Sequence, residues 1–340
     1  MLWLLFSGFP HIIPGVCREA MADLSTTRIL AFDFDLCVCD GEGFFELFTQ
    51  LLDIYEFCQL RRNMTDKHTQ SQKQALPEDF MDVVEKAYKT LALDAAAASK
   101  KKELFLFRPG MENVFRTAQL MKSQGHLNYI MFYSNNSCPE FLSFVELVIR
   151  LSNLNMFSVK KPVVELVFTA HTASRMKVER APAGQPNARE KTTRGIIQCL
   201  EDLDLPVSRH PEILFFDDMR HMGLGSALKI VPEYSALHTS QQIHDVFFGC
   251  LEKAGLFIGG ELRPEWQRLG IQNSLMKNSA SAFKDWLDEK DLPKQPLTTG
   301  PDFDKNLKVS DAMIGEIYTF CGVQAINKRK SRKRRGKYDS

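Results

Sequence analysis

The chain has 340 residues, enough for one large α/β domain with insertions or for two domains. Its 44% hydrophobic and 25% charged residues are the composition of a globular protein and exclude a disordered or fibrous chain. The net charge is only +1, but eight basic residues gather in residues 328–337, so the rest of the chain is mildly acidic.

The first element that the sequence predicts is a buried strand that ends at two carboxylates. The apolar run 29–32 is followed directly by Asp33 and, two positions later, by Asp35. Open α/β sheets bind their ligands at the carboxyl edge of the strands, which is where these two residues fall. Two acidic groups so close repel each other unless a cation lies between them or one of them holds a proton. Either arrangement indicates chemistry at this strand end.

Strands and helices then alternate along the chain. Apolar periodicity and the positions of Gly and Pro predict helices at 44–55 and 77–98 and a helix from 108–110 to about Gly125. A strand at 127–133, a helix at 138–152, a strand at 163–169, a loop at 173–190, a helix at 192–203 and strands at 213–216 and 228–231 follow. The last predicted elements are helices at 241–254 and 265–289, a linker at 291–305 and a helix at 309–320. Ser137 and Glu140 form a capping-box pattern for the helix at 138–152. The alternation predicts a parallel sheet with right-handed crossovers, an α/β Rossmann-like fold.

Polar residues collect where three of these strands end. They are Asp33 and Asp35, Ser134 and Asn135, and Asp217 and Asp218. Because the carboxyl ends of parallel strands meet at one edge of the sheet, we expect these side chains to lie close together.

Lys191, at the start of the helix predicted at 192–203, is a further feature of the sequence pattern. Lys191 precedes a helix that leads directly into the strand before Asp217, so we prefer it to its alternatives, Lys160, Lys161 and Lys177. His221 lies three residues beyond Asp218 and has two interpretations, substrate contact or simple packing.

The ordered set of D-x-D, S-N, a lysine at a helix start and D-D resembles the haloacid dehalogenase-like (HAD) superfamily, over about residues 28–235. The resemblance implies a Mg²⁺-dependent phosphohydrolase on an HAD-like core with a small helical cap. It assigns Asp33 as the nucleophile, Asp35 as the general acid and base, Ser134 and Asn135 as phosphoryl contacts and Lys191 as the neutralising cation. The implied metal site is made of oxygens from Asp33, Asp35 (through its backbone carbonyl), Asp217 and Asp218, which suit Mg²⁺ better than zinc. One departure is Cys37, where the family usually has Thr or Val.

The predicted organisation of the chain has five parts. They are an N-terminal extension at 1–24, a core domain at 25–43 and 106–240, a helical cap insertion at 44–105, a helical C-terminal extension at 241–327 and a basic tail at 328–340. A cap that closes over the site favours small phosphorylated metabolites, whereas a cap of two helices leaves room for a phosphoprotein. Both substrate classes stay open.

Two other functions are alternatives to phosphate hydrolysis. The chain could be a catalytically weak scaffold that binds a protein or nucleic acid through residues 328–337, or a phosphotransferase with a non-water acceptor. No apolar run approaches the roughly 20 residues of a membrane span, so no membrane partner is expected. Eight cysteines without a C-x-x-C pair indicate a reducing compartment. The basic tail has three interpretations, a nuclear-import signal, a contact for the nucleic-acid backbone or a solubilising end. We therefore expect the protein in the cytoplasm or the nucleus.

Overall fold

The structure is a computed structural model that describes part of the chain. The described residues are 26–39, 45, 48–49, 51–52, 78–101, 106–153, 157, 161–185, 188–234, 237–258, 261–263, 285, 288–289 and 299–323. The N-terminal extension, the basic tail and most of the helices predicted at 44–55 and 265–289 lie outside these residues.

A five-stranded parallel sheet forms the centre of the molecule. Its strands are β1 (Arg28–Phe32), β2 (Tyr129–Tyr133), β3 (Leu166–Phe168), β4 (Glu212–Asp217) and β5 (Leu228–Ile230), in the order β3-β2-β1-β4-β5. Every pair in this sheet is parallel. The predicted α/β class with a Rossmann-like parallel sheet is thereby confirmed.

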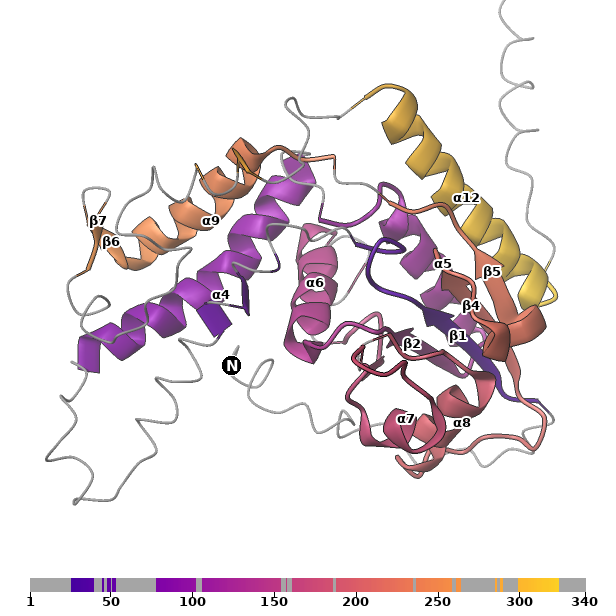
Figure 1. Cartoon of the computed structure of the whole chain (residues 1–340). Helices are drawn as coiled ribbons and strands as arrows, with labels where there is room; N and C mark the ends of the chain where they lie inside the picture. Colours follow the sequence, from indigo (N-terminus) through magenta and orange to yellow (C-terminus); the bar gives the residue numbers. More distant parts are fainter. Residues whose placement is uncertain are drawn as a thin grey trace, which may run out of the picture.

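Helices connect and cover the strands (Figure 1). They are α4 (Glu78–Lys101), α5 (Met111–Ser123), α6 (Pro139–Ser152), α7 (Ala173–Val178), α8 (Thr193–Glu201), the 3₁₀ helix η1 (Met222–Ala227), α9 (Ser240–Ala254) and α12 (Pro301–Phe320). A short antiparallel pair, β6 (Phe257–Ile258) and β7 (Glu261–Leu262), follows α9. Among the described residues, no helix combines the length and the apolar character needed to cross a bilayer.

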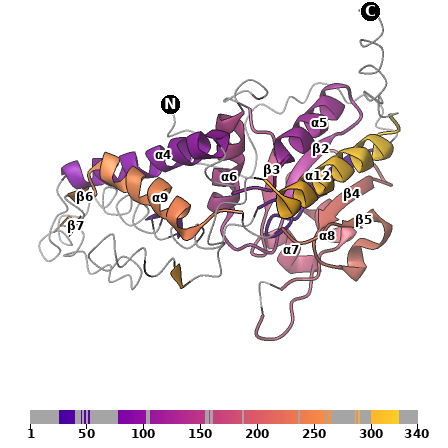
Figure 2. The same cartoon turned by 90° about the horizontal axis from the view of Figure 1, so that it is seen from above.

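Strand β1 is central because it is apolar on both faces. Ile29 and Ala31 join one buried cluster, and Leu30 and Phe32 join a second cluster on the opposite face. All four side chains are fully buried. The first cluster is closed by α8 and the second by α5 and α12, so the sheet is covered on both sides (Figure 2).

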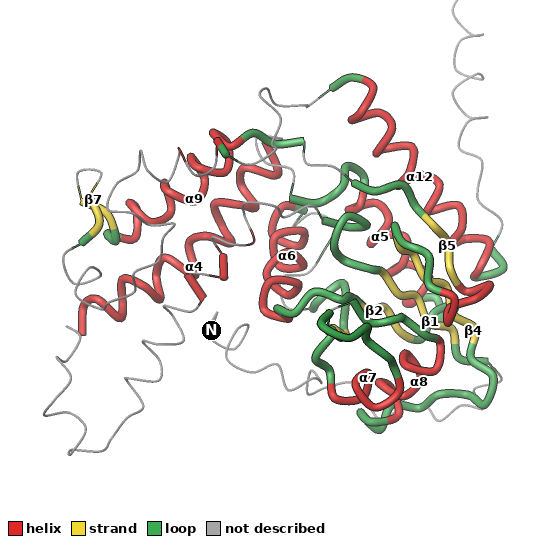
Figure 3. The backbone as a smooth tube through the Cα atoms, in the orientation of Figure 1, coloured by secondary structure: helices red, strands yellow, loops and turns green. Residues whose placement is uncertain are grey.

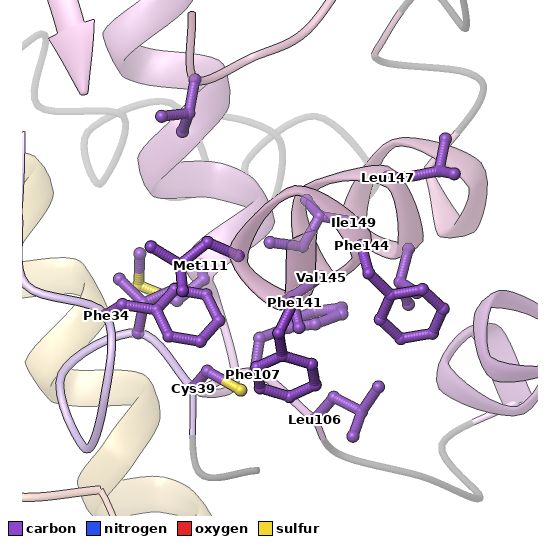
Figure 4. Packing of buried hydrophobic residues seen from close by; sticks show 14 of the residues in the cluster. Phe34, Cys39, Leu106, Phe107, Met111, Phe141, Phe144, Val145, Leu147 and Ile149 are labelled. Atoms are coloured by element: carbon purple, nitrogen blue, oxygen red, sulfur yellow. The ribbon is translucent and has the colours of Figure 1, made fainter. Parts of the chain in front are cut away.

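The second cluster extends from the sheet into α6. Phe34, in the loop after β1, lies with its ring centroid 5.7 Å from that of Phe141 on α6. Figure 4 shows these two side chains among the buried residues that fill the space between the loop and the helix, together with Met111 and Phe107. This packing fixes one side of the loop that carries Asp35.

Helix α4 lies in the chain between β1 and β2 but away from the sheet. It packs along α9 and against α6, and the tube in Figure 3 shows the α4–α9 pair extending to one side of the strands. Helix α12 packs instead on α5 and β4. Helices α9 and α12 therefore pack on different parts of the fold.

Three local predictions were wrong. Residues 173–178 form helix α7 within a segment predicted as loop. The N-cap of α6 is Cys138 rather than Ser137, without a side-chain cap hydrogen bond, and its backbone N–H donates to Asn136 Oδ1 at 2.8 Å. Helix α12 begins at Pro301, not at 309, since proline suits the first turn of a helix.

Candidate functional site

Three aspartates meet at the carboxyl edge of β1 and β4. Asp33 follows β1, Asp217 ends β4, and Asp218 comes next. These are adjacent strands at the point where the strand order reverses, the usual ligand site of such sheets. One carboxylate oxygen from each residue lies within 4.8 Å of the others.

Lys191 lies between two of these carboxylates. Its Nζ is 2.7 Å from Asp33 Oδ1 and 2.8 Å from Asp217 Oδ2. The side chains of Lys191 and Asp217 are 2% and 0% exposed, so both interactions are shielded from water. Burial alone lowers the pKa of Lys191, but the two carboxylates outweigh this effect and raise it above its usual range.

Of the other candidate lysines, the two that the structure describes are exposed rather than buried among the aspartates. Lys177 is exposed and pairs with Asp202 at 3.0 Å. Lys161 is also exposed, and Lys160 lies outside the described residues. The structure thus places Lys191, the preferred residue, at the site.

The single positive charge of Lys191 does not balance the negative charges of the three carboxylates. Burial, followed by the charge of Asp33, raises the pKa of Asp217. Burial and the charges of Asp33 and Asp217 raise the pKa of Asp218 to about 6. Three crowded carboxylates with oxygen donors only are a suitable set for a hard divalent cation, which would remove this repulsion.

Asp35 faces the loop after β2. Its Oδ1 accepts from Asn136 Nδ2 at 3.1 Å, and its Oδ2 accepts from Ser134 Oγ at 3.4 Å. Crowding by protein atoms and the nearby charge of Asp33 raise the pKa of Asp35 to about 6, although the residue is exposed. Its carboxyl group is therefore both oriented by hydrogen bonds and able to exchange a proton near neutral pH.

Asn135 points away from the aspartates. Its Oδ1 accepts from Arg175 Nη2 at 2.8 Å, and its Nδ2 donates to the carbonyl of Arg189 at 3.0 Å. The asparagine that reaches Asp35 is Asn136, which sequence reasoning missed. The role of Asn135 in substrate contact stays a prediction.

A buried ion pair behind the site was also missed. Arg175 Nε lies 2.8 Å from Glu179 Oε2, and Arg175 donates as well to the carbonyl of Ser134. Glu179 Oε1 accepts from the backbone N–H of Thr192, next to Lys191, at 2.9 Å. The pair therefore connects the Ser134 loop to the lysine. Opposite charges spaced i, i+4 were the signal for it in the sequence.

His221 packs behind Asp217. It is 6% exposed, and its Nε2 lies 3.5 Å from Asp217 Oδ2. Its Nδ1 accepts from the backbone N–H of Lys191 at 3.3 Å. Of the two interpretations of this histidine, its burial favours packing.

Cys37 lies beside the site but is shielded from solvent. Its thiol donates to the carbonyl of Phe216 at 3.5 Å and is fully buried. Burial, with the charge of Asp33, raises the pKa of this thiol well above its usual range. It is therefore a packing group in its protonated form.

Comparisons with protein-family models, with curated proteins and with solved structures found no match to this chain. The function is therefore inferred from the site itself.

Proposed function

We propose that the protein is a Mg²⁺-dependent phosphomonoester hydrolase with an HAD-like core, which forms an aspartyl-phosphate on Asp33. The observation that carries this proposal is the position of Lys191, buried between Asp33 and Asp217 with Asp218 beside them. A nucleophilic carboxylate next to a fixed cation and two further carboxylates suits attack on a phosphate dianion.

Asp33 would attack phosphorus through a carboxylate oxygen, forming an O–P bond while the bond to the leaving oxygen breaks. Asp35 would give its proton to that oxygen and then take a proton from the water that hydrolyses the aspartyl-phosphate. Its hydrogen bonds from Asn136 and Ser134 support this role, because they aim the carboxyl group. Lys191 would neutralise charge that develops on the phosphoryl oxygens.

The oxygens of Asp33, Asp217 and Asp218 would hold Mg²⁺, which when bound would screen the nucleophile from the negative substrate. The backbone carbonyl of Asp35 is the fourth proposed donor. It accepts from the N–H of Cys37 at 2.7 Å and, as a carbonyl, has a second lone pair.

The test is a panel of phosphorylated metabolites, phosphopeptides and 5′-phosphorylated oligonucleotides with Mg²⁺ or with EDTA. We expect hydrolysis that needs Mg²⁺ and is abolished in Asp33→Asn. Asp245→Asn, at an exposed carboxylate on α9, is the matched control and should keep full activity. Partner binding by the full chain without hydrolysis of any substrate would instead support the scaffold alternative.

A further inference from the structure

The segment 108–110 is used by no step of the proposed mechanism, yet it connects helix α12 to the loop after β1. The guanidinium of Arg108 is fully buried. Its Nε donates to the carbonyl of Cys37 at 2.9 Å, and its Nη2 donates to the carbonyl of Leu36 at 3.1 Å. These are the two residues that follow Asp35, so Arg108 is bonded directly to the loop that carries the proposed acid.

The other donors of Arg108 reach later parts of the chain. Its Nη1 donates to Asn306 Oδ1 on α12 at 2.7 Å, and its Nη2 donates to the carbonyl of Pro232 at 2.6 Å. Asn306 is itself oriented, because its Nδ2 donates to the carbonyl of Asp302 one turn earlier in α12 at 2.9 Å. The side chain of Arg108 thus spans from α12 to the loop.

Helix α12 also fits closely against the next two residues. Ser310 Oγ donates to the carbonyl of Pro109 at 2.7 Å. Gly110 has a φ of +88°, and a Cβ atom there would lie 2.9 Å from Ser310 Cβ. Only glycine allows both this backbone conformation and this approach of α12.

A second path leads from α12 to the same loop. Phe303 of α12 packs against the buried cluster of Tyr234 and Leu237, and the ring centroid of Tyr234 lies 5.3 Å from Arg108 Cζ. The backbone N–H of Tyr234 donates to the carbonyl of Leu36 at 2.6 Å. The Leu36 carbonyl therefore accepts from two donors, Arg108, which bonds to α12 through Asn306, and Tyr234, which belongs to a cluster that Phe303 of α12 covers.

The loop needs such support because of its backbone. Leu36 has a φ of 55°, a conformation that non-glycine residues rarely adopt. Strained backbone of this kind persists only where the surrounding structure determines it. We propose that Arg108 is a positioning residue, through which Asn306 of α12 fixes the loop that presents Asp35. The expected effect of Arg108 on turnover rests on the proposed function, whereas its expected effect on the loop conformation does not.

The experiment compares the full chain with Asn306→Ala, Arg108→Lys and a control. Asn306→Ala removes one acceptor from Arg108, and Arg108→Lys keeps the charge but cannot serve all four acceptors. The control is Ile317→Val, which trims a buried α12 side chain three turns away and loosens the helix without touching Arg108. Tm values identify variants that are generally destabilised.

Two readouts separate positioning from general stability. The first is amide hydrogen exchange of residues 34–39, whose N–H groups at Leu36, Cys37, Val38 and Cys39 bond within the loop. We expect exchange there to rise about tenfold in both Asn306→Ala and Arg108→Lys, with no change in residues 129–133 of β2. The second is turnover, where we expect kcat to fall about tenfold or more at nearly constant KM.

Ile317→Val should leave both readouts at wild-type values. Unchanged loop exchange in the two test variants, or an equal change in Ile317→Val, would overturn the positioning role. If the wild type hydrolyses no substrate, or Asp33→Asn stays active, the proposed function fails by itself. The exchange comparison then still decides whether α12 fixes the loop.

Discussion

The Nε atom of Arg175 lies 2.8 Å from Oε2 of Glu179, and neither side chain is exposed to solvent. Removing one partner leaves a buried charge uncompensated. We therefore expect Glu179→Leu to lower the free energy of unfolding by about 3–5 kcal/mol in urea titrations at pH 7. The double variant Arg175→Met/Glu179→Leu should recover part of this loss.

The exposed pair Lys177–Asp202 is the comparison for this prediction. The Lys177 side chain is 63% exposed, so Lys177→Met should change the unfolding free energy by less than about 1 kcal/mol. Equal changes in the unfolding free energy for Glu179→Leu and Lys177→Met would contradict the prediction that the buried pair contributes more to stability than the exposed pair.

Gly195 in α8 is predicted to tolerate no side chain. A Cβ atom at this position would overlap Glu179 Oε1 and Tyr133 Oη. We expect Gly195→Ala to destabilise the protein by about 1–3 kcal/mol in thermal or urea unfolding. Gly249→Ala in α9 is the control, because nothing lies within 4 Å of a Cβ there, and it should stabilise by about 0.5–1 kcal/mol.

Asp35→Asn should separate the two steps of the proposed reaction. An aryl phosphate has a good leaving group that needs little protonation, so the first step should survive, whereas hydrolysis of the aspartyl-phosphate should slow by about 10²–10⁴-fold. A stopped-flow trace should therefore show a burst of about one equivalent of phenol, followed by slow turnover. Asp33→Asn should give no burst, and full steady-state turnover by Asp35→Asn would contradict the role of Asp35.

The stability of the metal-free protein should decrease as pH rises from 5 to 7. The pKa of Asp218 is raised to about 6 in the folded state, so the folded chain binds this proton more tightly than the unfolded chain. The resulting stabilisation is complete below about pH 4 and is lost as pH rises through 6. Because Asp218 is only partly buried, solvent screening limits the effect to the order of 1 kcal/mol.

Urea titrations in EDTA at pH 5, 6 and 7 measure this slope. Asp218→Asn should flatten it, and Mg²⁺ should reduce it in the wild type, because the cation binds the deprotonated carboxylates. KCl at equal ionic strength is the control. A slope that is the same in wild type and Asp218→Asn would exclude this assignment.

The sequence was informative where one local pattern determined the structure. The run 29–32 is apolar at every position, which predicted a buried strand, and all four side chains are fully buried. Parallel strands place their carboxyl ends at one edge, which was enough to predict that Asp33 and Asp217 meet. Lys191 followed from its place before α8.

Tertiary contacts decided the features that the sequence did not reveal. Helix α7 is too short for a clear apolar period, and it is stabilised by the buried pair of Arg175 and Glu179. The contact between Arg108 and Asn306 joins residues 198 positions apart, and no pattern in either segment points to the other. Such residues become visible only when the chain is folded.

The central place of β1 has a consequence for how the protein is made. Its hydrogen-bonding partners, β2 and β4, lie about 100 and 184 residues further along the chain. On the ribosome, an apolar strand with two open edges must wait for most of the polypeptide to emerge, which exposes it to aggregation. Folding of the nascent chain should therefore depend strongly on chaperones that bind extended apolar segments.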